Sequence, residues 1–249
     1  MTDDRCEILR SLHVPGQPLL LPNAWDAASA QAVVAAGFPA VATTSSGVAA
    51  SLGYEDHQGA PADEMLAAAA RIARVVDVPV TVDAEAGYGL EPAELVAELQ
   101  RVGAAGCNLE ETDHEARALR EPNEQAAWLR QVRNAATAAG YGLVVNARID
   151  VFLSADPDVA QGELVADALV RGRAYLEAGA DCIYPIALSD ADALRAFVEG
   201  AGGPVNALAL PKAPPVRELA AIGVARVSWG GLLHRRALEQ LESALQQLS

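Results

Sequence analysis

The chain has 249 residues and a formal net charge of −15, and 51% of its residues are hydrophobic while 20% are charged. This composition allows a large apolar core, and the negative charge argues against binding to nucleic acid or to an anionic membrane surface. The N-terminus lacks a signal peptide's basic and apolar regions, and no apolar window of about 18 residues is free of charge, so we expect a soluble, cytoplasmic protein.

The first third of the chain alternates predicted helices and strands. We predict helices over residues 1–16, 27–36 and 62–76 and strands over residues 19–21 and 40–43. A polar loop is predicted over residues 53–61. The T-S-S-G sequence after the second strand predicts a loop of small hydroxyl and glycine residues, whose N–H groups suit an anion.

A third strand begins at Pro79, in an apolar and β-branched run typical of a buried parallel strand. It ends in Asp83 and Glu85, which the two-residue period of a strand places on one face. Two carboxylates so close together repel each other unless a cation lies between them, and Mg²⁺ (or Mn²⁺) suits such oxygen ligands. The alternative is that one carboxylate caps the next helix while the other is solvated.

The same unit recurs to the end of the chain: a helical segment ends in Gly, and an apolar run follows and closes with polar residues. Eight such βα units without a linker favour one (β/α)8 TIM barrel over residues 1–249, with a C-terminal helix over 232–248. An open doubly wound sheet is the alternative, but no G-x-G-x-x-G sequence follows the first strand.

In a barrel the carboxyl ends of the strands meet at one mouth, where the active site forms. The predicted strand ends carry charged, amide and hydroxyl side chains, namely Ser45, Ser46, Asp83, Glu85, Glu110, Glu111, Asn146, Arg148, Asp150 and Asn206. Structural layers of a barrel are filled by Val, Ile and Leu, so this polar set indicates a metal site.

Five sequences carry a resemblance to the isocitrate lyase/phosphoenolpyruvate mutase superfamily, from about Leu20 to Gly231. They are N-A-W-D-A-A-S-A, T-S-S-G-V-A-A-S-L-G-Y-E-D, V-D-A-E-A-G-Y-G, N-L-E-E and N-A-R-I-D, in that order. The resemblance implies a Mg²⁺-dependent barrel enzyme that makes or breaks C–C or P–C bonds of 2-oxo acids, or of their hydroxy-acid adducts, through an enolate. It also implies a homo-oligomer, in which we expect no extensive exchange of the last helix because little sequence follows it.

The resemblance assigns the metal to three carboxylates. Asp83 matches the carboxylate that binds the metal beside the substrate, and Glu85 and Glu110 would hold the ion directly or through water. Glu85 replaces the commoner aspartate, which is one methylene shorter.

The resemblance also assigns residues to the substrate. Ser46 and Gly47, with Ser45 beside them, match the loop that binds a substrate carboxylate or enolate oxygen. Arg148 matches the arginine that grips a carboxylate or phosphonate, and Asn206 occupies the place of a substrate-facing polar group. Arginine suits this role because its planar fork pairs with a carboxylate through two hydrogen bonds.

The proton-transfer groups depart from the superfamily pattern. The lyases carry a K-[KR]-C-G-H loop whose Cys supplies a proton, whereas this chain has E-T-D-H-E-A-R-A-L-R over residues 111–120. The mutases' Lys- and Asn-rich loop is also missing, and Ile186 replaces an acidic residue of the lyases. Asp56 of the loop after the second strand, Tyr88 and His114 are the candidate proton acceptors, and we expect His114 to be a solvated loop residue.

These features together predict a lyase: a Mg²⁺-dependent carbon–carbon lyase or decarboxylase that acts on a small 2-oxo acid or dicarboxylic acid through an enolate. One alternative is a phosphonopyruvate-type enzyme that acts on a P–C bond. Another is a non-catalytic relative that binds 2-oxo acids without converting them.

Overall fold

The structure is a computed structural model that describes residues 2–248. Its strands are β1 (Leu19–Leu21), β2 (Asn23–Ala24), β3 (Val41–Thr43), β4 (Val80–Asp83), β5 (Gly106–Glu110), β6 (Thr112–Asp113), β7 (Ala118–Leu119), β8 (Val144–Ile149), β9 (Cys182–Pro185), β10 (Asn206–Leu208) and β11 (Arg226–Ser228). Its helices are α1 (Thr2–Ser11), α2 (Ala27–Ala35), α3 (Ser45–Leu52), α4 (Ala62–Arg74), α5 (Pro92–Val102), α6 (Pro122–Ala138), α7 (Val151–Ser154), α8 (Gln161–Glu177), α9 (Ala191–Ala201), α10 (Val216–Ile222) and α11 (Leu232–Gln246).

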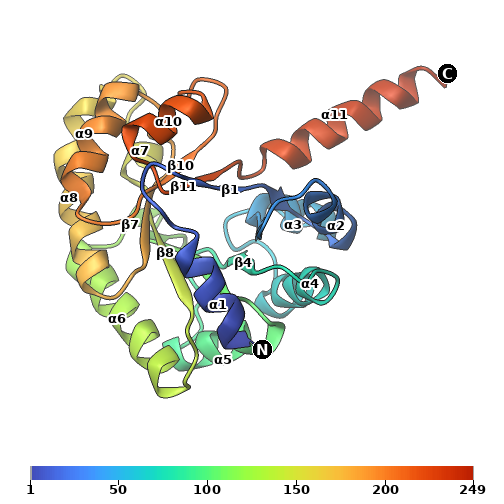
Figure 1. Cartoon of the computed structure of the whole chain (residues 1–249), viewed down its shortest axis with the longest axis horizontal. Coiled ribbons are helices and arrows are strands. Elements are labelled where there is room, and N and C mark those ends of the chain that lie inside the picture. Colours follow the sequence, from blue (N-terminus) through green and yellow to red (C-terminus); the bar gives the residue numbers. More distant parts are fainter. Residues whose placement is uncertain (1, 249) are drawn as a thin grey trace.

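Parallel strand pairing closes these elements into a barrel. One run of paired strands has the order β2-β3-β4-β5-β8-β9, and a second has the order β1-β11-β10. A parallel bridge between Ile183 and Val205 joins β9 to the start of β10. At the other junction, β1 and β2 are two parts of one strand interrupted at Pro22, whose nitrogen has no hydrogen to donate. The predicted (β/α)8 barrel is therefore confirmed, and Figure 1 shows helices around the sheet.

The outer helices pack on the barrel through faces that the sequence specifies. α5 starts at Pro92, in the first turn where a missing N–H has no cost, and ends at Gly103 with a φ of 82°. Leu95 and Leu99, one turn apart on this helix, are fully buried in the core. No helix within residues 2–248 combines the length and the apolar character needed to cross a membrane.

The T-S-S-G segment is helical, so the prediction of a loop there was wrong. Thr44 keeps an extended backbone, and Ser45 begins α3 directly. Gly47 packs so closely that an added Cβ would lie 2.8 Å from the Thr44 side chain and 3.1 Å from that of Trp25. The reason for the helix is thus tertiary: a residue with no side chain lets this turn lie against the barrel.

The last helix, α11, extends away from the barrel in Figure 1. None of its described residues is buried, and Leu238, Leu241 and Leu245 are 45–54% exposed. Only its first turn lies against the barrel, where the His234 ring meets the Trp25 ring edge-on at 5.0 Å. The leucines of this helix therefore face solvent in the isolated chain.

We expect His13 to make the folded protein less stable at acidic pH. His13 lies buried between α1 and β1, with its Nδ1 2.8 Å from the Leu9 carbonyl oxygen. Burial, and then the charge of Arg226, lowers the pKa of His13 from 6.5 to about 4. The unfolded chain therefore binds more protons than the folded chain between these values, and stability falls as the pH drops from 6.5 to 4. The loss should be about 3 kcal/mol, since one pKa unit corresponds to about 1.4 kcal/mol.

Urea titrations at pH 7 and pH 4 on the parent and on His13→Gln would measure this contribution. The free energy of unfolding should fall less between the two pH values in the variant. An equal fall in both proteins would show that His13 does not cause the acid sensitivity.

Candidate active site

A cavity of about 290 Å³ opens at the carboxyl ends of the barrel strands. Seven of the predicted site residues line it, namely Ser45, Ser46, Asp56, Asp83, Glu85, Glu110 and Arg148. They come from five separate segments, which the closed barrel brings to one mouth. This cavity is therefore the candidate active site.

Asp83 is the last residue of β4, and only one of its two carboxylate oxygens accepts a hydrogen bond from the described residues. Its Oδ2 accepts a hydrogen bond of 2.9 Å from the Ser45 backbone N–H, and its own N–H donates to Thr43 Oγ1 at 2.8 Å. Its Oδ1 is buried and has no hydrogen-bond donor among the described residues. A buried carboxylate oxygen without a partner is costly, so this atom is suited to hold a cation.

Glu85 lies beside Asp83 on a strained stretch of backbone. Its φ is 48°, and its Oε2 accepts a hydrogen bond of 2.5 Å from the backbone N–H of Gln58, whose φ is 59°. Burial, followed by repulsion from Asp83, raises the pKa of Glu85 from 4.5 to about 8. Non-glycine residues at positive φ are uncommon, and their clustering here indicates a functional constraint.

Glu110, at the end of β5, holds two cationic or polar neighbours. Its Oε2 lies 2.5 Å from Arg148 Nη1, and its Oε1 lies 2.6 Å from His114 Nε2. Burial raises the pKa of Glu110, while Arg148 and His114 oppose that rise. The hydrogen bond to Glu110 in turn raises the pKa of His114.

The expectation of a solvated His114 was wrong, because the His114 side chain is only 14% exposed. The β6–β7 hairpin, which the sequence analysis did not predict, folds the loop after β5 back over the site. The His114 and His57 rings lie there with their centroids 5.5 Å apart and their planes tilted by 40°.

The three carboxylates fit a metal ion that has one direct protein ligand. Within residues 2–248, no three His, Cys, Asp or Glu side chains lie close enough to bind one ion together. Asp83 Oδ1 is nevertheless a free buried anionic oxygen, with the acidic side chains of Glu85 and Glu110 across the same cavity. Mg²⁺ commonly binds through one or two carboxylates and keeps several waters, which suits this arrangement.

Arg148, on β8, is buried and is held by two carboxylates. Its Nε donates to Asp150 Oδ1 at 2.6 Å, and its Nη1 pairs with Glu110. Burial alone would lower the pKa of Arg148, but Asp150 and Glu110 outweigh that effect and raise it. Arg148 thus forms ion pairs within the protein, and its guanidinium still lines the cavity.

Behind Arg148, Asp150 and Glu111 face away from the cavity and brace it. Asp150 accepts a hydrogen bond of 2.5 Å from the Thr112 hydroxyl, and its backbone N–H donates to Glu111. Glu111 is fully buried and accepts hydrogen bonds from Arg171 and Tyr175 of α8. Glu110 and Glu111 thus serve opposite sides of β5, as strand alternation requires.

Several predicted residues do not line the cavity, among them Gly47, Tyr88 and Asn206. Gly47 lies in the first turn of α3 behind Ser46. Tyr88 lines a neighbouring hollow with His57 and His114, and its hydroxyl donates to the Asp83 carbonyl oxygen at 3.2 Å. Asn206 is fully buried inside the barrel, where its amide donates to the Ser228 hydroxyl at 3.1 Å.

Asn108 and Arg235 are among the lining residues that the sequence analysis missed. Asn108 precedes Glu110 by two residues on β5, so strand alternation could have placed it on the cavity side. Arg235 comes from the first turn of α11 and adds a second arginine to the cavity. No local signal marks it, because only the return of the chain after β11 brings α11 to the mouth.

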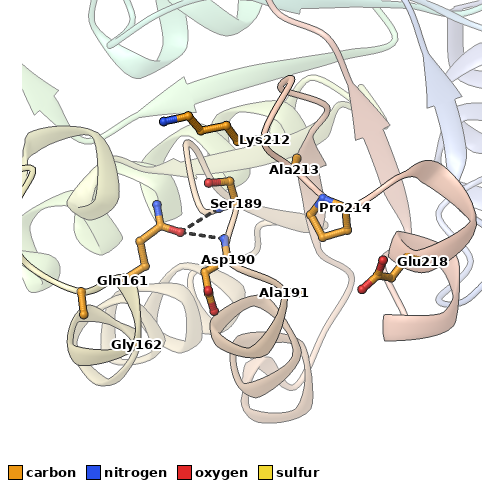
Figure 2. A pocket seen from close by; sticks show the side chains of 10 residues that line it. Gln161, Gly162, Ser189, Asp190, Ala191, Lys212, Ala213, Pro214 and Glu218 are labelled. Atoms are coloured by element: carbon orange, nitrogen blue, oxygen red, sulfur yellow. Dashed lines mark hydrogen bonds between the residues drawn. The ribbon is translucent and has the colours of Figure 1, made fainter.

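A larger groove of about 720 Å³ lies between the starts of α8 and α9 and the loop after β10 (Figure 2). The Gln161 amide oxygen accepts hydrogen bonds of 2.9 Å from the backbone N–H groups of Ser189 and Asp190, which ties two of these segments together. Asp190 in turn caps α9. Gln161 and Asp190 therefore support the loops around the groove. The groove does not bring several carboxylates together as the barrel mouth does.

The chain matches known proteins over almost its whole length. Residues 9–249 match the family model described as phosphoenolpyruvate phosphomutase. The chain is 33% identical to an uncharacterized protein of Mycobacterium tuberculosis over 238 residues, covering 96% of this chain and 87% of that protein. It is 32% identical to 2-methylisocitrate lyase of Salmonella typhimurium over 213 residues, covering 79% of this chain and 70% of that enzyme.

Among solved structures, the chain is similar to a protein of Burkholderia cenocepacia J2315 that is provisionally named a phosphonomutase. The two are 40% identical, with a TM-score of 0.95 and full coverage of both chains. The 2,3-dimethylmalate lyase structure shares the fold, with a TM-score of 0.87 at 24% identity, over 100% of this chain and 85% of that one.

A (β/α)8 barrel with acidic side chains at its mouth, and with lyases among its relatives, defines an enzyme of the lyase class. The chain belongs to the phosphoenolpyruvate phosphomutase family, within the isocitrate lyase/phosphoenolpyruvate mutase superfamily.

Proposed function

We propose that the chain is a Mg²⁺-dependent carbon–carbon lyase or decarboxylase that acts on a small 2-oxo acid or dicarboxylic acid through an enolate. The observation that carries this proposal is the free buried Oδ1 of Asp83, which faces a cavity that also holds Glu85, Glu110 and Arg148. Three acidic groups and an arginine suit a ligand that carries both a metal and a carboxylate into the site.

Different residues would bind the metal ion, the keto or enolate oxygen and the carboxylate of the ligand. Asp83 would hold Mg²⁺ directly, with Glu85 and Glu110 acting through water, and the bound ion would supply Lewis-acid polarisation of the keto group. The backbone N–H of Ser46, which lines the cavity in the first turn of α3, can donate to an oxygen that gains negative charge, and the N–H of Gly47 follows it in the same turn. Arg148 would pair with a carboxylate and orient it.

Proton transfer is assigned to Asp56 on the loop between α3 and α4. Asp56 lines the cavity, and its Oδ1 is buried without a hydrogen-bond donor among residues 2–248. Tyr88 is less suited, because burial raises the pKa of its hydroxyl well above 10 and the Asp83 carbonyl occupies it. Decarboxylation needs no such base, whereas retro-aldol cleavage does.

Oxaloacetate turnover tests the proposal. Pyruvate formation with protein and Mg²⁺ should exceed the sum of the rates with Mg²⁺ alone and with protein in EDTA. A panel of small 2-oxo and 2-hydroxy dicarboxylic acids would then identify the preferred substrate. If none of them is converted but oxalate or pyruvate still raises the melting temperature with Mg²⁺, the chain is a non-catalytic binder.

Phosphonopyruvate chemistry is the second candidate, supported by the 40% identity to the Burkholderia protein named as a phosphonomutase. The Arg148 guanidinium could pair with a phosphonate as well as with a carboxylate. Incubation with phosphonopyruvate, followed by detection of phosphate or of phosphoenolpyruvate, separates the two functions. Either product in the absence of any C–C activity would favour the P–C enzyme.

We also propose that the chain assembles as a homo-oligomer through α11. Exposed leucines form a stripe on this helix, and an apolar groove of about 620 Å³ lies beside its base, between α2 and Trp229. Exposed apolar surface of this extent is unusual for a monomer. The structure thus favours a larger role for α11 in assembly than the sequence predicts.

Light scattering at micromolar concentration should give a mass of at least two chains. The double variant Leu241→Glu and Leu245→Glu should dissociate, because it places charges in the stripe. Val170→Glu on α8, where Val170 is 61% exposed, is the matched control and should keep the parent mass. A monomeric parent would disprove the proposed assembly.

A further inference from the structure

A chain of asparagines crosses the interior of the barrel below the candidate site. Asn146 Nδ2 donates to Asn108 Oδ1 at 2.8 Å and to Asn206 Oδ1 at 3.2 Å. Asn206 Nδ2 donates onward to Ser228 Oγ at 3.1 Å. Of these three amides, only that of Asn108 lines the cavity.

An asparagine amide can face either way, so its neighbours decide which atom it presents. Arg226 lies beneath Asn108, and its Nη2 donates to Asn108 Oδ1 at 3.0 Å. A guanidinium can only donate, so a reversed Asn108 would bring two donors together. Arg226 therefore fixes Oδ1 downward and leaves the Nδ2 hydrogens of Asn108 for the cavity. No hydrogen bond from that Nδ2 is made within the described chain.

Burying Arg226 at this position is energetically unfavourable. It is 1% exposed, none of the described carboxylates lies within ion-pair distance of it, and its Nε and Nη1 have no hydrogen-bond partner. Burial without a counter-charge lowers the pKa of its guanidinium. A buried cation without a paired anion destabilises a protein, and replacing buried charges by apolar side chains of similar volume is often neutral or stabilising. Stability alone thus gives no reason for Arg226.

We propose that Asn108 contacts the substrate, donating its amide N–H to an oxygen of the bound 2-oxo acid, and that Arg226 is the positioning residue that holds this amide in its donor orientation. The inference rests on the proposed function, because it names a further recognition group of the same cavity. Asn108 would then supply a hydrogen-bond donor at the cavity floor, in addition to the acidic side chains that line the same cavity. A ligand must therefore place an acceptor oxygen at the floor, as a carboxylate or an enolate does.

Calorimetric titration of Mg²⁺-loaded protein with oxalate and with pyruvate, combined with melting temperatures, tests both parts. Asn108→Asp replaces the donor with an anionic acceptor, so affinity for both anions should fall about 10- to 100-fold, the usual range for a hydrogen bond to a charged group. The same change gives Arg226 a carboxylate partner, so the melting temperature should stay level or rise. Asn206→Asp, the matched control, buries a carboxylate away from Arg226 and should lower the melting temperature.

Arg226→Met tests the positioning role. It should weaken oxalate binding several-fold in the parent and have no further effect in an Asn108→Ala background, because Arg226 acts through Asn108. An equal loss in both backgrounds would overturn the positioning role. Unchanged affinity in Asn108→Asp would overturn the substrate contact. Failure of the parent itself to bind oxalate or pyruvate with Mg²⁺ would instead count against the proposed function, and the inference would fall with it.

Discussion

Asp83→Asn should abolish the Mg²⁺-dependent reaction, with kcat lower by at least about a thousandfold. The Asp83 Oδ1 is the free carboxylate oxygen that would bind the ion, and an amide oxygen carries no charge. The fold should survive, because an asparagine oxygen can still accept the hydrogen bond from the Ser45 N–H. Calorimetric titration with Mg²⁺ should show binding by the parent and little or none by the variant.

Asp113→Asn is the matched control for this experiment. Asp113 lies nearby on β6, but it accepts hydrogen bonds from the Glu115 and Ala116 N–H groups and does not line the cavity. The control should bind Mg²⁺ and turn over substrate like the parent. If Asp83→Asn bound Mg²⁺ as tightly as the control, Asp83 would not be the metal ligand.

Arg148→Lys should weaken binding of 2-oxo acids by about 1.5–3 kcal/mol, the usual contribution of a hydrogen bond to a charged group. Lysine keeps the charge but loses the planar fork that pairs with a carboxylate. From the sequence alone we expect the melting temperature to change little. The structure changes this expectation, because the guanidinium also pairs with both Glu110 and Asp150 and one ammonium cannot replace both bonds. Stability should therefore fall as well.

Asp150→Asn separates the two effects of Arg148. It removes one ion pair while the guanidinium remains at the cavity, so stability should fall with a smaller loss of ligand affinity than in Arg148→Lys. Affinity should be measured well below the melting temperature, so that all the protein is folded. Parent-like affinity in Arg148→Lys would remove Arg148 from substrate recognition.

Strand alternation explains why much of the site could be predicted. Asp83 and Glu85 follow a buried strand at a spacing of two, and both line the cavity as expected. Glu110 and Arg148 close the neighbouring strands β5 and β8, where they face each other as register partners. For Asp83, Glu110 and Arg148 the strand period and the parallel arrangement of the barrel were enough, whereas Glu85 reaches the cavity from beyond the strand end, at a φ of 48°.

The contacts between distant segments could not be predicted in this way. His114 reaches Glu110 only because the hairpin after β5 folds back, and Tyr88 turns aside at a φ of 57°. Asn108 receives its orientation from Arg226, which lies 118 residues further along the chain. No local pattern encodes which of two amide atoms will face a cavity.

The barrel, the order of its strands and the carboxylates at their ends could be predicted from local patterns, because they depend on periods of two and 3.6 residues within short segments. The tertiary structure alone decided which of these side chains remain free. Asp83 Oδ1 has no hydrogen-bond donor among residues 2–248, while Asp150 and Glu111 accept hydrogen bonds behind the site. The physical reason is that a polar group's partner is set by strand register and by the path of the loops, and both are fixed only when the barrel closes.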